Sequence, residues 1–423
     1  MLIFFYNIAQ LAILLLFWPV LLILMAVTPK YRSSVPARLG HGLSTIQRSK
    51  GNAKKTFWIH ALSVGEVTSA APLVTGIRNK YPDSRIIVTT ATTTGQSVAR
   101  DLLASAADHI LASPFDLLPV VQRYLRVIHP DIFILVETDF WPNLIASLFR
   151  HDIPAILVNG RISQKSFAAY SKHSWFFLPM FRRLHCICLQ SEEEKAKFEM
   201  LGVQPEKLRT LGNLKYDLPD QVVSTSNLAR LLPNDRLIFI AGSTHPGEEE
   251  AIFSAYSHIR NKHPELYLIL VPRKPERANE ILALGHRFNL LGAKRTDEPE
   301  MPNDYLLVNT IGELVELYRY SDIAFTGGSL VAAGGHNPIE PARMGLPVLF
   351  GPHMEDFQEI AREFTSHGAA QTVADTFELT AVLQELVKDR SIRHRMGSAA
   401  HAVVASRQGI VTRHLDVIDL LLS

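Results

Sequence analysis

Short apolar runs alternate with longer amphipathic stretches through most of the chain. The runs at 56–62, 84–92 and 131–138 read TFWIHAL, SRIIVTTAT and DIFILVET, which predicts strands that are buried on both faces. The stretch at 66–82 has apolar residues at helical spacing and predicts a helix. A second series of this kind begins at residue 236. The pattern therefore predicts an α/β protein with two Rossmann-like domains that face each other, each a doubly wound parallel sheet covered by helices.

The beginning of the chain departs from this pattern. Residues 2–27 contain no charged residue, and only Asn7 and Gln10 are strongly polar interruptions. A bilayer is spanned by about 20 apolar residues, and no convincing signal-peptide cleavage site follows the run. Three basic residues come directly after it: Lys30, Arg32 and Arg38. We therefore expect an uncleaved membrane anchor over residues 1–28, with the rest of the protein on the cytoplasmic side.

The chain divides where the strand–helix rhythm stops. Residues 213–235 contain prolines and many Ser, Thr and Asn residues but no sustained strand pattern, which is typical of an interdomain linker. The expected N-terminal domain then covers residues 29–212. The expected C-terminal domain covers residues 236–423 and ends in a mostly helical stretch.

Composition narrows the class of protein. Apolar residues make up 47% of the chain and the formal net charge is only +2, which indicates a folded globular protein and argues against a nucleic-acid partner. The two cysteines, Cys186 and Cys188, lie in an apolar strand pattern, which favours reduced and buried thiols. They have no obvious further ligands at suitable spacing, so we expect no metal site.

Several familiar enzyme motifs are absent from the sequence. Neither half has G-x-G-x-x-G after its first strand, and the chain has neither a P-loop nor a G-x-S-x-G elbow. Dehydrogenases, P-loop nucleotidases and α/β-hydrolases are therefore poor fits. Two α/β halves without these motifs favour, by analogy of fold, a two-domain glycosyltransferase or a related sugar-nucleotide enzyme.

Glycines and polar residues gather directly after the predicted strands. In the C-terminal half the Gly-rich segment 327–340 leads to Glu340, whose carboxylate is suited to accept hydrogen bonds from both ribose hydroxyls while backbone N–H groups meet phosphate. Alone, this segment could equally be a turn with Glu340 as a helix cap. Four loops of this kind favour a nucleotide site. In the N-terminal half Glu66 and Glu137 also follow strands, and two carboxylates there make general-base catalysis plausible.

A resemblance rests on motifs that run in order along nearly the whole chain: HALSVGE, ETDFWPN, NGRIS, GNLKYD, VPRKPER, IGELVELY and GGSLVAAGGHNPIEPA. Together they resemble the 3-deoxy-D-manno-octulosonic acid (Kdo) transferases of Gram-negative bacteria. The resemblance implies an inverting, metal-independent glycosyltransferase of the GT-B type that needs no cofactor. It also implies transfer of Kdo from CMP-Kdo to the lipid A precursor, lipid IVA, at the cytoplasmic face of the inner membrane.

The resemblance also implies roles for particular residues. Glu66 is expected to be the general base, and Glu137 and Lys215 are expected to support the transition state. Three segments match those that bind CMP in the family: Pro272 and Arg273; Ile311, Gly312 and Glu313; and Asn337, Pro338, Ile339 and Glu340. Basic residues of the N-terminal half could meet lipid phosphates, and Arg161 is the best single candidate because it lies in a loop at a strand end.

Two other classes of function stay open on the sequence alone. The first is another two-domain glycosyltransferase, or a sugar-nucleotide epimerase, that uses a different donor. The second is a non-catalytic nucleotide-binding subunit at the membrane. The carboxylates expected in the cleft argue against the second.

Overall fold

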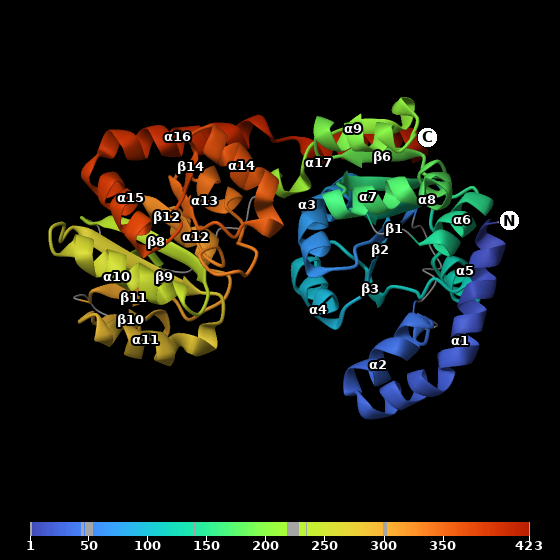
Figure 1. The fold of residues 1–423 in the computed structure, drawn as a ribbon, viewed down its shortest axis with the longest axis horizontal. Coiled ribbons are helices and arrows are strands. Elements are labelled where there is room, and N and C mark those ends of the chain that lie inside the picture. Colours follow the sequence, from blue (N-terminus) through green and yellow to red (C-terminus); the bar gives the residue numbers. More distant parts are fainter. Residues whose placement is uncertain are drawn as a thin grey trace. The chain divides into compact units, whose positions relative to one another are not determined.

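The computed structural model describes residues 2–43, 46, 54–138, 141–217, 228–233, 235–298 and 303–422. The chain folds into two compact units (Figure 1). Unit 1 contains Met1–Pro219 and Gly409–Ser423, and unit 2 contains Asp220–Gln408.

Unit 1 is built around a sheet of seven parallel strands. They are β1 (Thr56–His60), β2 (Arg85–Thr90), β3 (His109–Ala112), β4 (Ile132–Val136), β5 (Ala155–Gly160), β6 (Cys186–Leu189) and β7 (Leu208–Thr210). Its α-helices are α1 (Leu2–Val27), α2 (Pro29–Arg38), α3 (Val64–Lys80), α4 (Thr93–Leu102), α5 (Leu118–Ile128), α6 (Pro142–Arg150), α7 (Gln164–Lys172), α8 (Ser174–Phe181), α9 (Glu192–Met200) and α17 (Ile410–Leu422). Two short 3-10 helices, η2 (Pro205–Lys207) and η3 (Leu214–Tyr216), flank β7.

Unit 2 repeats this architecture. Its strands are β8 (Leu237–Thr244), β9 (Leu266–Pro272), β10 (Gly292–Lys294), β11 (Tyr305–Leu307), β12 (Ile323–Thr326), β13 (Val348–Phe350) and β14 (Ala370–Thr372). Its α-helices are α10 (Glu248–Arg260), α11 (Ala278–Arg287), α12 (Leu314–Tyr318), α13 (Ile339–Arg343), α14 (Gln358–Ser366), α15 (Thr376–Lys388) and α16 (Arg390–Ser406). Its 3-10 helices are η4 (Leu228–Leu231), η5 (Pro275–Arg277), η6 (Arg295–Asp297) and η7 (Glu355–Phe357).

The strand orders confirm the predicted fold class. They are β3-β2-β1-β4-β5-β6-β7 in unit 1 and β10-β11-β9-β8-β12-β13-β14 in unit 2, and all the pairings are parallel. Both sheets are buried on both faces because helices cover them, which is why strands such as β1, β4 and β9 are buried at every position and are mostly apolar. In each sheet the strands on one side of the first strand precede those on its other side in the sequence, so the switch point lies between β1 and β4 in unit 1 and between β8 and β12 in unit 2. Ligands bind to doubly wound sheets beyond the strand ends at such switch points.

The units differ from the domain boundaries drawn from the sequence. The end of the expected C-terminal domain, Gly409–Ser423, belongs to unit 1, because α17 packs on α3 and η3. In Figure 1 this red helix lies among the elements of unit 1. Residues 228–231 of the expected linker form η4, whose Leu228 is fully buried in the core of unit 2. The linker positions 218–227 and 234 lie outside the described residues.

Helix α1 is the one helix, among the described residues, that is long and apolar enough to cross a membrane. Most of its described side chains are exposed, including Leu16, which is 71% exposed, and Trp18, which is 56% exposed. A soluble protein rarely leaves an apolar surface of this extent open to water. This finding agrees with the predicted anchor over residues 1–28.

Candidate active site

The candidate catalytic residues of unit 1 lie at its switch point. Glu66 is in the first turn of α3, directly after β1, and Glu137 directly follows β4. Strands β1 and β4 are neighbours in the sheet although two other strands separate them in the sequence. The fold therefore places these two carboxylates at adjacent strand ends.

The Glu66 carboxylate is held by the start of its own helix. One oxygen, Oε2, accepts from the backbone N–H of Leu62 at 2.7 Å, and Oε1 accepts from the Ser63 hydroxyl at 2.9 Å. Ser63 is the N-cap of α3 and accepts from the Glu66 backbone N–H. The spacing Ser63-x-x-Glu66 is the sequence signature of a capping box, and here the Glu66 carboxylate reaches one residue further back, to the N–H of Leu62. The sequence interpretation overlooked that signature here. A carboxylate has about four acceptor positions, so these two hydrogen bonds do not by themselves use all of its acceptor capacity.

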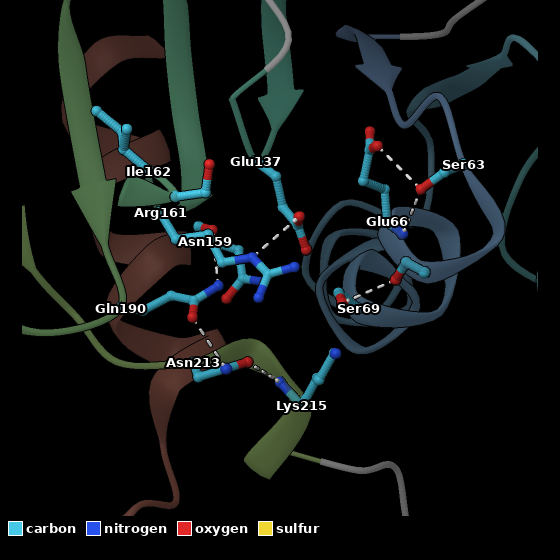
Figure 2. A network of polar contacts seen from close by, with 12 residues as sticks. Ser63, Glu66, Ser69, Glu137, Asn159, Arg161, Ile162, Gln190, Asn213 and Lys215 are labelled. Carbon is cyan, nitrogen blue, oxygen red and sulfur yellow. Dashed lines mark hydrogen bonds and ion pairs between the residues drawn. The ribbon is translucent and has the colours of Figure 1, made fainter. Parts of the chain in front are cut away.

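Glu137 faces a basic partner across the strand ends. Its Oε2 lies 3.5 Å from Nε of Arg161, which follows β5 (Figure 2). The Glu137 backbone has φ of 58°, a left-handed conformation that a residue with a side chain adopts only where its surroundings impose it. Such strained positions concentrate at functional sites. Arg161 therefore has a partner within the site as well as 42% of its side chain exposed.

A chain of amides positions Lys215. Asn159 is fully buried at the end of β5. Its side-chain oxygen accepts from the backbone N–H of Leu214, and its backbone carbonyl accepts from the Gln190 side-chain amide. Gln190 in turn accepts from Asn213, whose side chain caps η3 by accepting from the Lys215 backbone N–H (Figure 2). The sequence motifs containing Asn159 and Asn213 were identified, but neither residue was assigned a role.

Helix α17 packs against η3, the short helix that carries Lys215. Asp217 accepts from the backbone N–H groups of Gly409 and Val411, at 2.9 and 2.6 Å. The Arg413 guanidinium donates to the carbonyl of Leu211. The last helix therefore fastens the segment that carries Lys215.

A buried carboxylate, that of Glu248, holds the Gly-rich loop of unit 2 in place. Glu248 is fully buried, and its carboxylate accepts from the backbone N–H groups of Gly328, Ser329 and Leu330 at 2.7–2.9 Å. Three backbone N–H groups of this loop are therefore bound inside the protein, and only other N–H groups of the Gly-rich segment could meet a phosphate. Glu248 also accepts from the backbone N–H of His245, so one carboxylate joins the loops after β8 and β12. The signal for this role was an acidic residue in the first turn of a helix, which usually indicates only a favourable dipole.

Two histidines meet at the switch point of unit 2. Their Nε2 atoms are 2.9 Å apart, with one ring from His245 after β8 and the other from His336 in the loop after β12. Burial, together with the nearby charges of Arg273 and His245, lowers the pKa of His336 to about 4. Arg273 itself is exposed, directly after Pro272 at the end of β9. One of the two rings therefore donates its Nε2–H to the other, beside the exposed cation of Arg273, and sequence reasoning had not singled out the histidines.

Glu340 lies in the short helix α13, next to its cap. Asn337 donates its amide to Oε1 of Glu340 at 3.2 Å and accepts from the backbone N–H of Ile339, while Pro338 is buried at the start of the helix. Burial raises the pKa of Glu340 to about 7. A carboxylate with one identified donor and an unfavourable desolvation energy gains most when ligand hydroxyls donate to it.

The raised pKa of Glu340 predicts a change of stability with pH. The folded form binds its proton more tightly than the unfolded chain, so the stabilisation is complete below about pH 4.5 and is lost as the pH rises through about 7. Glu340→Gln should remove this dependence and unfold at a higher temperature than wild type at pH 8.5. Thermal unfolding of both proteins at pH 5 and pH 8.5 measures this pH dependence of stability. An identical pH dependence in the two proteins would contradict the prediction.

The segment 311–313 is more exposed than its neighbours. Ile311 is 89% exposed, and Gly312 has φ of 92°, which favours glycine. Glu313 is bound within the protein: its carboxylate accepts from the Arg295 guanidinium, 3.1 Å away, and from the Thr310 hydroxyl. Glu313 therefore holds this turn in place, and the turn presents Ile311 and Gly312 at the surface.

Candidate metal ligands do not gather in the described part of the chain, where no three His, Cys, Asp or Glu side chains are arranged to hold an ion. Glu137 and Asp139 are two residues apart in the sequence and could have formed a pair of ligands, but Asp139 lies outside the described residues. Cys186 and Cys188 are buried free thiols, as predicted from the apolar strand pattern.

Comparison with known proteins places this chain in a family. The family model for 3-deoxy-D-manno-octulosonic-acid transferase (kdotransferase) matches residues 33–218. The 3-deoxy-D-manno-octulosonic acid transferase of Haemophilus influenzae is 34% identical over 98% of this chain and 97% of its own length. That of Rickettsia felis is 31% identical over 88% of this chain and 80% of its own length.

Solved structures support the fold alone. The UDP-GlcNAc 2-epimerase of Neisseria meningitidis has a TM-score of 0.58 and covers 83% of this chain and 99% of its own, at 12% identity. At 12% identity the likeness shows only a shared architecture. The matches to Kdo transferases, by contrast, extend along the sequence. The chain, with two Rossmann-like units of the GT-B type and carboxylates at the unit 1 switch point, therefore belongs to the 3-deoxy-D-manno-octulosonic acid transferase family and is a glycosyltransferase.

Proposed function

We propose that this protein transfers Kdo from CMP-Kdo to the lipid A precursor, lipid IVA, with inversion at the anomeric carbon. The observation that carries the proposal is the match to a Kdo transferase over 98% of the chain. Family membership argues against an epimerase and against a non-catalytic subunit. The apolar helix α1 supports a lipid acceptor and a location at the cytoplasmic face of the inner membrane.

The reaction assigns each group a task. The acceptor hydroxyl oxygen forms a bond to the anomeric carbon of Kdo, and its proton passes to the Glu66 carboxylate. The bond from that carbon to the phosphate oxygen breaks, and CMP leaves with the electron pair. Positive charge grows on the sugar ring in the transition state, where Glu137 would help to stabilise it. Lys215 and Arg273 would stabilise the negative charge that develops on CMP.

The donor nucleotide is assigned to unit 2. Glu340 would accept from the ribose hydroxyls, with Asn337 fixing its orientation. Arg273 and the His245–His336 pair would face the phosphate, and the turn at Ile311 and Gly312 would contact the cytidine part. The lipid acceptor is assigned to unit 1, where the exposed part of Arg161 would meet one of its phosphates.

Mass spectrometry of the product made from CMP-Kdo and lipid IVA by the purified chain tests this function. The expected product is heavier than the acceptor by one or more Kdo residues. Competition of the reaction by CMP but not by UDP would support the donor. If the folded wild-type protein gave no Kdo-bearing product, the proposal would be overturned.

The proposed mechanism predicts insensitivity to metal removal. Fixed cations such as Lys215 and Arg273 carry the charge stabilisation that a divalent ion provides in other transferases. Transfer should therefore continue at an undiminished rate after exhaustive treatment with EDTA. Complete loss of transfer that Mg²⁺ restores would contradict the metal-independent mechanism.

A further inference from the structure

The polar residues near the start of α1 bind the body of unit 1. The Tyr6 hydroxyl donates to Oδ2 of Asp116 at 3.0 Å, and Gln10 donates to the Asp116 carbonyl at 3.1 Å. Asn7 and Asn143 exchange amide hydrogen bonds of 2.9 and 3.0 Å in the two directions. Asn143 is fully buried, so this contact replaces water at both amides. The two polar interruptions of the apolar run, Asn7 and Gln10, therefore have protein partners.

The chain returns to the same loop after α2. The Arg38 guanidinium donates to the carbonyl of Ser113 at 3.1 Å, and the Arg38 carbonyl accepts from Phe115 N–H at 3.2 Å. The Tyr124 hydroxyl also donates to the carbonyl of Ala37. Ser113 and Asp116 are three residues apart. The contacts of unit 1 with the start of α1 and with the end of α2 are therefore within about 10 Å of each other along the chain. In Figure 1, α1 and α2 form a hairpin that joins unit 1 at both of its ends.

A hairpin with this geometry cannot connect opposite faces of a membrane. The hydrocarbon core is about 30 Å thick, about three times the distance between the two attachment points. The apolar stretch beyond Gln10, residues 11–27, is also only about 25 Å long as a helix. A spanning arrangement would detach Asn7 and Gln10 from their partners and leave two amides in hydrocarbon, each of which costs free energy.

Basic side chains flank the apolar stretch at both ends. Near its beginning, Arg150 and Arg183 line a pocket of about 520 Å³ together with Ile3, Phe4 and Asn7. Burial and the neighbouring Arg150 charge lower the pKa of Arg183. Beyond its end, Arg32 is exposed on α2. Cations at both ends match the two places where a helix lying within one leaflet would meet lipid phosphates.

We propose that α1 lies within a single leaflet of a phospholipid membrane, entering and leaving it on the side that holds unit 1, and that it does not cross. The length and composition of an apolar 26-residue helix leave open both a single span and a position in the interface, and this proposal commits to the second. The inference rests on the membrane attachment in the proposed function but not on the donor, the acceptor or the reaction. It assigns Asn7, Gln10, Asp116 and Asn143 the role of holding the hairpin against the body.

Cross-linking in native membranes tests this arrangement. In the full chain, Phe4→Cys with Arg150→Cys should be joined by a short bis-maleimide in inner-membrane vesicles, and Phe4→Cys with Arg183→Cys should be joined as well, because these side chains line one pocket. The matched control, Leu16→Cys with Arg150→Cys, places one thiol on the exposed part of α1 and should stay unjoined. Retained Kdo transfer shows that each variant is folded, and the two native cysteines are buried.

A membrane-impermeant maleimide gives a second readout. Phe5→Cys should be labelled in inside-out vesicles and should not be labelled from the periplasmic side of spheroplasts. Loss of both cross-links in protein that stays with the membrane after a high-salt wash would overturn the single-leaflet arrangement, as would labelling of position 5 from the periplasm. Release of the unmodified protein by salt would instead overturn the membrane attachment itself, and this inference with it.

Discussion

Glu66→Gln is expected to lower the rate of Kdo transfer by about 10²–10⁴-fold while the protein stays folded. Glutamine keeps the size of the side chain and can still accept from Leu62 N–H and donate to the Ser63 hydroxyl, so the helix start survives. It cannot take a proton from the acceptor. CMP binding, which is assigned to unit 2, should be nearly unchanged. Single-turnover transfer, a melting temperature and a CMP titration on the same preparation measure the three effects.

The capping geometry requires controls that separate structure from catalysis. Glu378→Gln is matched to the test, because Glu378 also accepts from a backbone N–H four residues before it, that of Ala374, at 2.7 Å, in a helix of unit 2. Ser63→Ala removes the cap hydroxyl and keeps the carboxylate. Ser63→Ala should cost about 0.5–2 kcal/mol of stability and Glu378→Gln about 0.3–1 kcal/mol, and both should leave most of the transfer activity.

A particular combination of results would remove Glu66 from the mechanism. If the glutamine variant is folded and transfers Kdo at close to the wild-type rate, the carboxylate acts only as a helix cap. Glu137 would then be the next candidate for the base, since it lies at the adjacent strand end. If Ser63→Ala lost as much activity as Glu66→Gln, the conformation of the loop rather than proton transfer would be the cause.

Glu340→Ala is expected to weaken CMP binding by about 1.5–3 kcal/mol, which is roughly a 10–150-fold higher Kd. The carboxylate would otherwise accept from two ribose hydroxyls in a place where water solvates it poorly. Its removal should not unfold unit 2, because burial disfavours the charge that is taken away. Calorimetric titration of the full chain with CMP at pH 8 measures the loss.

The pH dependence of CMP affinity adds a second test of Glu340. Its pKa of about 7 means that the wild-type protein should gain affinity as the pH rises through that value, because the charged form is the stronger acceptor. CMP itself ionises near pH 6, so the informative quantity is the difference between wild type and Glu340→Gln. Glu363→Ala, which removes a surface partner of Arg407, is the matched control and should bind CMP normally. Unchanged CMP affinity in Glu340→Ala would exclude the ribose contact.

The sequence was sufficient to predict the two sheets. Strands such as β4 and β9 are apolar at every position, and in a protein of this size such runs occur where helices cover both faces of a parallel sheet. The sequence also predicted correctly that polar residues such as Glu66 and Glu137 directly follow strands. Strand order came from the structure, and it is the order that makes Glu66 and Glu137 neighbours although about 70 residues separate them.

What the sequence could not predict are hydrogen bonds between distant segments. Glu248 looks like any acidic residue at a helix start, and its bonds to residues 328–330 depend on β8 and β12 being adjacent. Likewise, Asn7 and Gln10 read as interruptions of an apolar run, because their partners Asp116 and Asn143 are more than 100 residues away. Periodicity reports which face of an element is buried and says nothing about such partners.

The return of α17 to unit 1 has a consequence for how the protein is made. Unit 2 occupies residues 220–408 without interruption, so it leaves the ribosome complete while unit 1 still lacks its last helix. Domains usually fold in the order of synthesis, at about 5–20 residues per second. Here the surface of α3 and η3 that α17 covers must wait roughly 10–40 s while the intervening residues are translated. We therefore expect the second unit along the chain to finish folding first, and the segment carrying Lys215 to be fastened only when Asp217 meets Gly409 and Val411.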